Sequence, residues 1–160
     1  MTLANILLPR LSEWRPHSAP EVLTVADDAG VWSAAVTAAA VDVVGARLWD
    51  VTFRKANAAL GAPALKAWGE KLASRVTGLL EPLRLLEVDE TNKVALLRSD
   101  KPGQRGDAVL YYEVRLTADG AATVQRFQAS HQPETKRKQI EFALTHEVLA
   151  KLSEDVTGAL

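Results

Sequence analysis

The stretch of sequence that decides the fold is residues 108–127, AVLYYEVRLTADGAATVQRF, where two alternating segments flank an Asp-Gly pair. An Asp-Gly pair in such a setting is a strong signal for a β-hairpin. If Asp119 and Gly120 are the two loop residues, three cross-strand pairs follow: Ala118 with Ala121, Tyr112 with Phe127, and Glu113 with Arg126. This register predicts an aromatic pair on the core face of the hairpin and an ion pair on its other face.

Further segments of the second half of the chain are predicted to extend this hairpin into a sheet. Residues 83–89 and 93–99 form a second hairpin around the turn at 89–92, and residues 137–144 alternate like a strand. We expect residues 100–107 and 130–135 to be polar, mobile loops. Thr145 then caps a final helix that ends at Gly158, with an apolar stripe of Val148, Leu149, Leu152 and Val156.

The first half of the chain predicts a helix, three strands and a second helix. Residues 2–14 have helical spacing, with Pro9 expected to kink the helix or to start a shorter one. A mobile segment at 15–20 precedes strands at 21–26, 31–39 and 46–55; the last places Trp49, Val51 and Phe53 on its core face. Residues 63–78 form a helix with Pro63 in its first turn and Gly78 at its C-terminal cap.

Alanine makes up 26 of the 160 residues, and several alanines lie in the 31–39 strand. One face of that strand carries Trp32, Ala34, Val36 and Ala38, and the other carries Ser33, Ala35, Thr37 and Ala39. Because small side chains let two elements approach closely, we expect the 63–78 helix to pack on the second of these faces.

Together these segments predict an α+β fold. We expect a largely antiparallel, twisted sheet, or two such sheets, of about seven to eight strands in the order α-βββ-α-βββββ-α, with the helices packed on one face. At 160 residues a single domain is expected, divided into a helix and linker (1–20), a meander plus helix (21–80) and a five-stranded segment plus helix (81–160). The opening α-βββ-α order is similar to that of small secretion chaperones, and the additional strands depart from it; this likeness is one of topology alone.

Composition excludes several classes of protein. The chain has no cysteine, so it has no disulfide, thiolate nucleophile or Cys-ligated metal. A formal net charge of -1 argues against a strongly basic nucleic-acid binder. The apolar run at residues 6–8 is too short for a signal peptide, and no window of about 20 residues is apolar enough to cross a membrane. We therefore expect a cytoplasmic protein that has no cofactor and contacts no membrane.

The three histidines show no catalytic or metal-binding pattern. His17 and His131 lie in predicted loops, and His146 opens the final helix, where we expect it on the surface. The zincin pattern fails because position 150 is alanine where a second His is needed. An enzyme that uses His146 with Glu147 or a nearby Asp is one hypothesis; we expect a non-catalytic protein instead.

The remaining polar groups are spread along the chain. The carboxylates at 27–28 and 87–90 lie at predicted turns, where Asp is common, so we predict no metal site. Residues 136–138, with Arg98, Arg115 and Tyr111, form a candidate basic and aromatic patch for single-stranded nucleic acid. Because Glu113 and Glu141 are expected on the same face as Tyr111 and Arg115, we expect an ordinary solvated sheet face there and no nucleic-acid binding.

Two functional hypotheses follow. The first is a non-catalytic protein-interaction module of adaptor, chaperone-like or immunity type, which binds a protein partner or self-associates through an edge strand or a helix. Its candidate surface residues are Trp14, Tyr111, Arg115 and Arg126. The alternative is a small-ligand-binding domain whose apolar pocket is lined by Trp32, Trp49 and Trp68. Core packing is the ordinary role of these three indoles.

Overall fold

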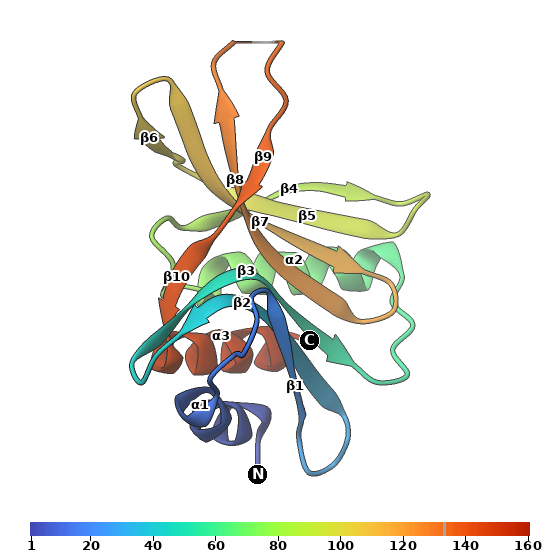
Figure 1. Cartoon of the computed structure of the whole chain (residues 1–160). Helices are drawn as coiled ribbons and strands as arrows, with labels where there is room; N and C mark the ends of the chain where they lie inside the picture. Colours follow the sequence, from blue (N-terminus) through green and yellow to red (C-terminus); the bar gives the residue numbers. More distant parts are fainter. Residues whose placement is uncertain (133) are drawn as a thin grey trace.

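The computed structural model describes residues 1–132 and 134–160, and over these residues the chain forms three helices and ten strands (Figure 1). The helices are α1 (Leu3–Glu13), α2 (Ala62–Arg75) and α3 (His146–Gly158). The strands of the first half are β1 (Glu21–Ala26), β2 (Trp32–Val41) and β3 (Gly45–Lys55). Those of the second half are β4 (Leu83–Asp89), β5 (Val94–Ser99), β6 (Gly103–Arg105), β7 (Ala108–Thr117), β8 (Ala121–Ser130), β9 (Lys138–Ile140) and β10 (Phe142–Thr145).

The strands form one antiparallel sheet, which confirms the predicted α+β class. The main order is β1-β2-β3-β8-β7-β5-β4, so the pairing of β3 with β8 joins the two halves of the chain. The strand count is ten where seven to eight were expected, for two reasons. The predicted loop at 100–107 contains β6, which pairs with β7. The predicted strand at 137–144 is divided into β9, which pairs with β8, and β10, which pairs with β3. Pro133, in the third segment expected to be mobile, lies outside the described residues.

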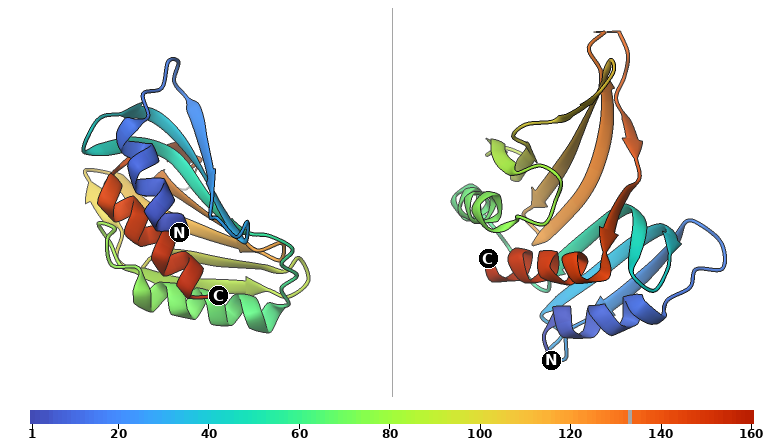
Figure 2. Two further views of the ribbon diagram at one scale, coloured as in Figure 1. Left: turned by 90° about the horizontal axis from the view of Figure 1, so that it is seen from below. Right: turned by 90° about the vertical axis from the view of Figure 1, so that its left-hand side faces the viewer.

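All three helices pack on one face of the sheet, as predicted (Figure 2). This inner face is continuous across the strands, because buried apolar residues pair directly: Val25 with Ala34, Val36 with Val51, Val51 with Val124, and Val124 with Val114. α1 lies over β1 and β2, and α2 lies over β4, β5 and β7. The prediction that α2 packs on the small-residue face of β2 is therefore wrong. That face is the outer face of the sheet, which no helix covers in the described structure.

The register of the β7–β8 hairpin differs by one residue from the prediction. Leu116 pairs with Ala122, β7 ends at Thr117 and β8 begins at Ala121, so the loop consists of the three residues 118–120. Gly120, the third of them, adopts a φ of +83°. A three-residue hairpin loop with a left-handed third residue is a common alternative to the two-residue loop. The Gly120 N–H donates to the Thr117 carbonyl at 3.0 Å. Since side chains alternate between faces, this shift moves every residue of β8 to the opposite face from the one expected.

The shift changes the predicted partners of the hairpin. Tyr111, not Tyr112, lies opposite Phe127, and both are on the outer face. Tyr112 lies opposite Arg126 on the inner face, and Glu113 lies opposite Gln125. The expected Glu113–Arg126 ion pair therefore does not form, because the two side chains lie on different faces of the sheet.

The helix boundaries show where side-chain packing outweighs local signals. α1 runs through Pro9 to Glu13, because Leu7 and Leu11 on its core side are completely buried. α2 ends at Arg75, so Gly78 is not its cap. Thr145 caps α3 as predicted: its Oγ1 accepts the Val148 N–H at 3.1 Å. No helix among the described residues is long and apolar enough to cross a membrane.

Candidate functional site

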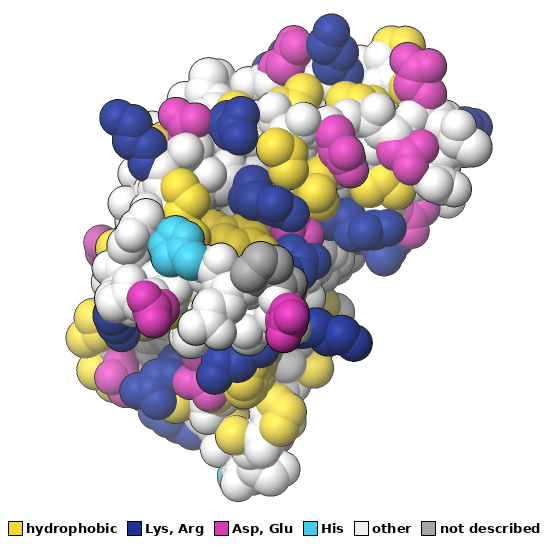
Figure 3. Space-filling model, turned by 90° about the horizontal axis from the view of Figure 1, so that it is seen from above, with side chains coloured by type: hydrophobic (Ala, Val, Ile, Leu, Met, Phe, Trp, Pro, Cys, Tyr) yellow, Lys and Arg dark blue, Asp and Glu magenta, His cyan; other side chains and the backbone are white. Residues whose placement is uncertain are grey.

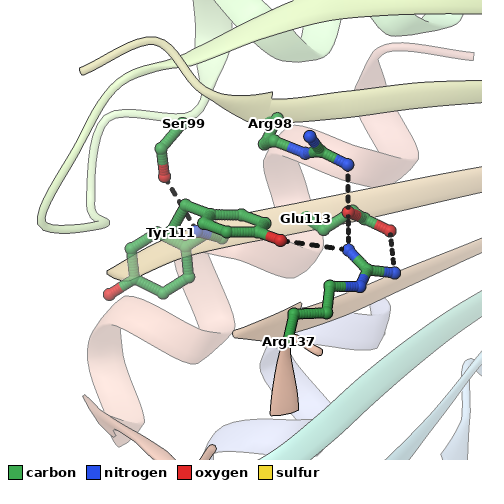
Figure 4. Close-up of polar contacts among 6 residues, drawn as sticks. Arg98, Ser99, Tyr111, Glu113 and Arg137 are labelled. Carbon is green, nitrogen blue, oxygen red and sulfur yellow. Dashed lines mark hydrogen bonds and ion pairs between the residues drawn. The ribbon is translucent and has the colours of Figure 1, made fainter. Parts of the chain in front are cut away.

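A cluster of charged and aromatic side chains on the outer face of the sheet is the main candidate site, and Glu113 on β7 is its centre (Figure 4). The Glu113 carboxylate accepts a hydrogen bond from Arg98 Nη2 on β5 at 3.0 Å. It also accepts from Arg137, which precedes β9: Nη1 donates at 2.6 Å and Nη2 at 3.4 Å. Arg137 Nη1 lies 3.3 Å from the Tyr111 hydroxyl as well. One carboxylate therefore joins three segments of the sheet.

Each of the two guanidinium groups stacks on an aromatic ring of the outer face. The Arg137 guanidinium lies 3.9 Å from the ring centroid of Phe127, and the Arg98 guanidinium lies 4.9 Å from that of Tyr111. The two rings are direct cross-strand neighbours with centroids 6.0 Å apart. A cation over an aromatic face within about 6 Å is attracted by the ring quadrupole. The rings and the carboxylate thus fix both arginine side chains before any ligand arrives.

The cluster carries more positive than negative charge. The Glu113 side chain is only 9% exposed, whereas Arg137 is 41% and Arg98 35% exposed. The hydrogen bonds to Glu113 raise the pKa of Arg137 above its ordinary value, so its charge is permanent. Arg115, two residues further along β7, is exposed on the same face, and no described carboxylate lies within ion-pair distance of it. The arrangement is suited to binding an anionic group, because two guanidinium groups surround a single carboxylate.

Arg126 belongs to a second, buried cluster on the inner face. Its guanidinium donates to both oxygens of Glu81 at 2.9 and 3.1 Å, and the two side chains are only 6% and 10% exposed. Ser99 Oγ donates to Glu81 at 3.0 Å and accepts the Tyr112 N–H at 2.8 Å. The guanidinium also stacks 4.1 Å from the Tyr112 ring, whose hydroxyl has a pKa raised by burial. Arg126, expected on an interaction surface, is therefore buried on the inner face of the sheet.

The structure separates the tryptophans that were expected to share a pocket. Trp32 and Trp68 meet in the core with ring centroids 6.3 Å apart, and Trp68 Nε1 donates to the Val156 carbonyl at 3.1 Å. Trp49 occupies a bulge of β3, where the pairing with β2 skips it, and is only half-buried. Trp14 is half-buried and donates from Nε1 to Glu21 at 3.1 Å. A surface hollow of about 410 Å³ lies along residues 40–42, 44–47 and 143–145, and no indole lines it.

His146 is buried, so the prediction of a surface position is wrong. It is 2% exposed, because the turn between β2 and β3 covers the start of α3. The Val44 carbonyl accepts the His146 N–H at 2.9 Å, and the Asp42 carbonyl lies 2.7 Å from Nε2, which must therefore carry the proton. Nδ1 is buried without a partner in the described structure. His17 and His131 are exposed, and the described residues hold no group of three metal-ligating side chains.

The turn carboxylates bind their own backbone. Asp89 accepts the N–H groups of Thr91 and Asn92 at 3.0 Å each, and the hydrogen bonds from Asn92 lower the pKa of Asp89 below its ordinary 3.8. Asp42 likewise accepts the N–H groups of Gly45 and Val44, which lower its pKa. Asp89 lies at a turn, where the sequence placed it, and Asp42 supports a turn that the sequence interpretation did not single out.

Sequence reasoning found part of the outer cluster. Alternation correctly placed Tyr111, Glu113 and Arg115 on one face, opposite Tyr112. It missed Phe127, because the assumed register put that ring on the core face. Lys136 and Lys138 do not join the cluster; they line a hollow of about 320 Å³ together with the start of β7 and the end of β8. No known protein family, curated protein or solved structure matches this chain.

Proposed function

We propose that this protein is a non-catalytic interaction module that binds an acidic segment of a partner protein on the outer face of its sheet. The observation that carries the proposal is the pair of partly exposed arginine side chains, Arg98 and Arg137, whose guanidinium groups stack on aromatic rings around a single carboxylate. This pair lies on the face that the helices leave uncovered.

The geometry favours a carboxylate as the group that binds. Glu113 accepts from one Nη atom of Arg98 and from both Nη atoms of Arg137, and each guanidinium has five N–H donors, more than these contacts use. The Arg98 Nε is buried without a partner in the described structure, so a second acceptor would approach the Nη groups. Planar guanidinium donors match the two oxygens of a carboxylate. Stacking on Tyr111 and Phe127 reduces the side-chain freedom that binding would otherwise remove, which favours affinity.

The charge pattern favours a protein partner over a nucleic acid. A nucleic-acid site tracks a phosphate backbone with a continuous basic surface. At the end of the molecule where the β6–β7 and β8–β9 pairs project, acidic and basic side chains are interspersed around hydrophobic ones (Figure 3). The formal net charge of -1 also opposes general attraction to a polyanion.

Fluorescence anisotropy with a fluorescein-labelled peptide of alternating Glu and Ala tests the proposal. Arg98→Gln/Arg137→Gln should weaken binding about tenfold or more, because both charge-assisted contacts are lost. Glu113→Gln should tighten it, because the amide oxygen still accepts a hydrogen bond beside the guanidinium groups while the negative charge that repels an acidic peptide is removed. Far-UV circular dichroism checks that each variant is folded.

The matched control is Lys66→Gln/Lys71→Gln, which removes two exposed positive charges from α2 on the opposite side of the sheet. This control should bind the peptide as the wild type does. Equal loss in both double variants, or no loss in either, would show that the outer cluster is not the site. Tighter binding of a single-stranded oligonucleotide than of the peptide would overturn the choice of partner.

A further inference from the structure

The two strands at the ends of the main sheet order, β1 and β4, differ in how their free edges are protected. β4 carries Arg84, Glu87 and Asp89, and its pairing with β5 is interrupted between Leu85 and Glu87. Charges and bulges are the usual devices that prevent an edge strand from pairing with another chain. β1 has no charged side chain beyond Glu21, its first residue, and no bulge. The segment Val22–Ala26 contains no proline and pairs with β2 without a break.

The backbone of β1 presents free hydrogen-bonding groups on its outer edge. The Asp27 N–H donates to the Trp32 carbonyl at 3.0 Å, in the same register as the β1–β2 pairs. In an antiparallel ladder, hydrogen-bonded and non-bonded residues alternate. Val22, Thr24 and Ala26 therefore direct their peptide groups away from β2, and all three are exposed, Val22 by 56%.

We infer that β1 pairs antiparallel with β1 of a second copy of this chain, and so joins two sheets into one across a two-fold axis. With the axis at Leu23, Leu23 lies opposite its own copy on the inner face, which extends the core beneath α1. Val22 lies opposite Thr24 on the outer face, so the peptide groups of these two residues face one another. Glu21 then lies opposite Val25.

A second copy fits this edge because β1 is complementary to itself. Antiparallel pairing about a two-fold axis keeps the inner and outer faces of the two sheets aligned. No like charges oppose each other in this register, whereas an axis at Thr24 would place Glu21 opposite Asp27. Apolar and small residues at the seam, with the free peptide groups between them, are the elements of strand addition.

The absence of cysteine permits a clean test with single cysteines. Thr24→Cys places a thiol on the outer face next to the axis, where the two copies are diagonal neighbours about 7–8 Å apart. A short bismaleimide should link Thr24→Cys into a covalent dimer. Thr91→Cys, at the exposed turn between β4 and β5, is the control and should form no covalent dimer, because this turn lies far from the proposed seam. Linking of both variants, or of neither, would overturn the inference.

Sedimentation equilibrium gives a second readout. The wild type should sediment as a dimer, and Thr24→Lys should be a folded monomer, because two added like charges are then diagonal neighbours at the seam. Thr91→Lys should remain dimeric. A monomeric wild type, or a dimeric Thr24→Lys, would contradict the inference. The inference does not rest on the proposed function, since Thr24→Lys should still bind the acidic peptide and the Arg98/Arg137 variant should still dimerise.

Discussion

Replacing Glu81 with glutamine tests the buried ion pair that the structure places on the inner face. The change leaves the Arg126 guanidinium, 6% exposed, without its carboxylate. The Ser99 hydroxyl donates to the Glu81 carboxylate, and a neutral amide is a weaker hydrogen-bond acceptor than that carboxylate. The two charged hydrogen bonds, at 2.9 and 3.1 Å, are replaced by at most one bond to a neutral amide oxygen, because the amide nitrogen is a donor and cannot accept from the guanidinium. We therefore expect a large loss of folding stability with no change in the fold.

The size of the loss follows from burial. Removing one partner of a buried ion pair costs about 3–5 kcal/mol, because the other charge stays uncompensated in a poorly solvated site. For a chain of this length, that corresponds to a fall in Tm of roughly 6–20 °C. The exposed pair of Arg84 and Asp100, 57% and 51% exposed and 3.5 Å apart, provides the contrast. Arg84→Gln should cost about 0–1 kcal/mol.

Urea unfolding followed by circular dichroism measures both variants, together with Glu81→Met/Arg126→Met. Replacing both partners with apolar residues removes the unpaired charge, so the double variant should be more stable than Glu81→Gln. A cost below about 1 kcal/mol for Glu81→Gln would refute the burial of the pair. A double variant less stable than Glu81→Gln would refute the argument that the unpaired charge causes the loss.

Three further predictions concern the core and the turns. Gly120→Ala should destabilise the protein by more than Gly106→Ala. Both glycines have positive φ, but only the Cβ at 120 would lie 2.6 Å from a neighbouring methyl group. Urea unfolding measures the free energy of both variants, and equal losses would contradict this contact. Trp68→Phe should cost about 1–3 kcal/mol, because it leaves a carbonyl of α3 without its indole donor in the core, and an unchanged urea midpoint would contradict the packing described. The pKa of Asp89 is lower in the folded chain than its ordinary 3.8, so its stabilisation is present above that pH and lost as pH falls through the folded value. Asp89→Asn should therefore show a smaller drop in Tm than the wild type below about pH 4, and parallel curves would contradict this.

The sequence predicted the fold class because its signals were local. Alternation in the 108–117 and 121–127 segments and the Asp-Gly turn indicate a hairpin without any knowledge of the rest of the chain. The hairpin register was not predictable in the same way. The close approach of Gly120 to Lys55 and Ala58 is a tertiary contact, and the loop conformation accompanies it. The register in turn decides that Arg126 is buried and Phe127 faces outward.

The candidate site was predictable only in part for a similar reason. Residues of one strand, such as Tyr111, Glu113 and Arg115, share a face by alternation alone. That Arg98 and Arg137 meet at Glu113 depends on the order of β5, β7, β8 and β9 in the sheet, which local patterns do not encode. The burial of His146 likewise depends on the β2–β3 turn, more than 100 positions away in the sequence.

The most direct test of the central claim, that the outer face of the sheet binds an acidic protein segment, is a titration of the ¹⁵N-labelled protein with the Glu-Ala peptide, followed by two-dimensional NMR. Amide signals of β5, β7 and β8 around Arg98, Glu113 and Phe127 should shift with increasing peptide. Signals of the three helices on the inner face should stay in place. Shifts confined to the helices, or no shifts at peptide concentrations that saturate the anisotropy signal, would contradict the account.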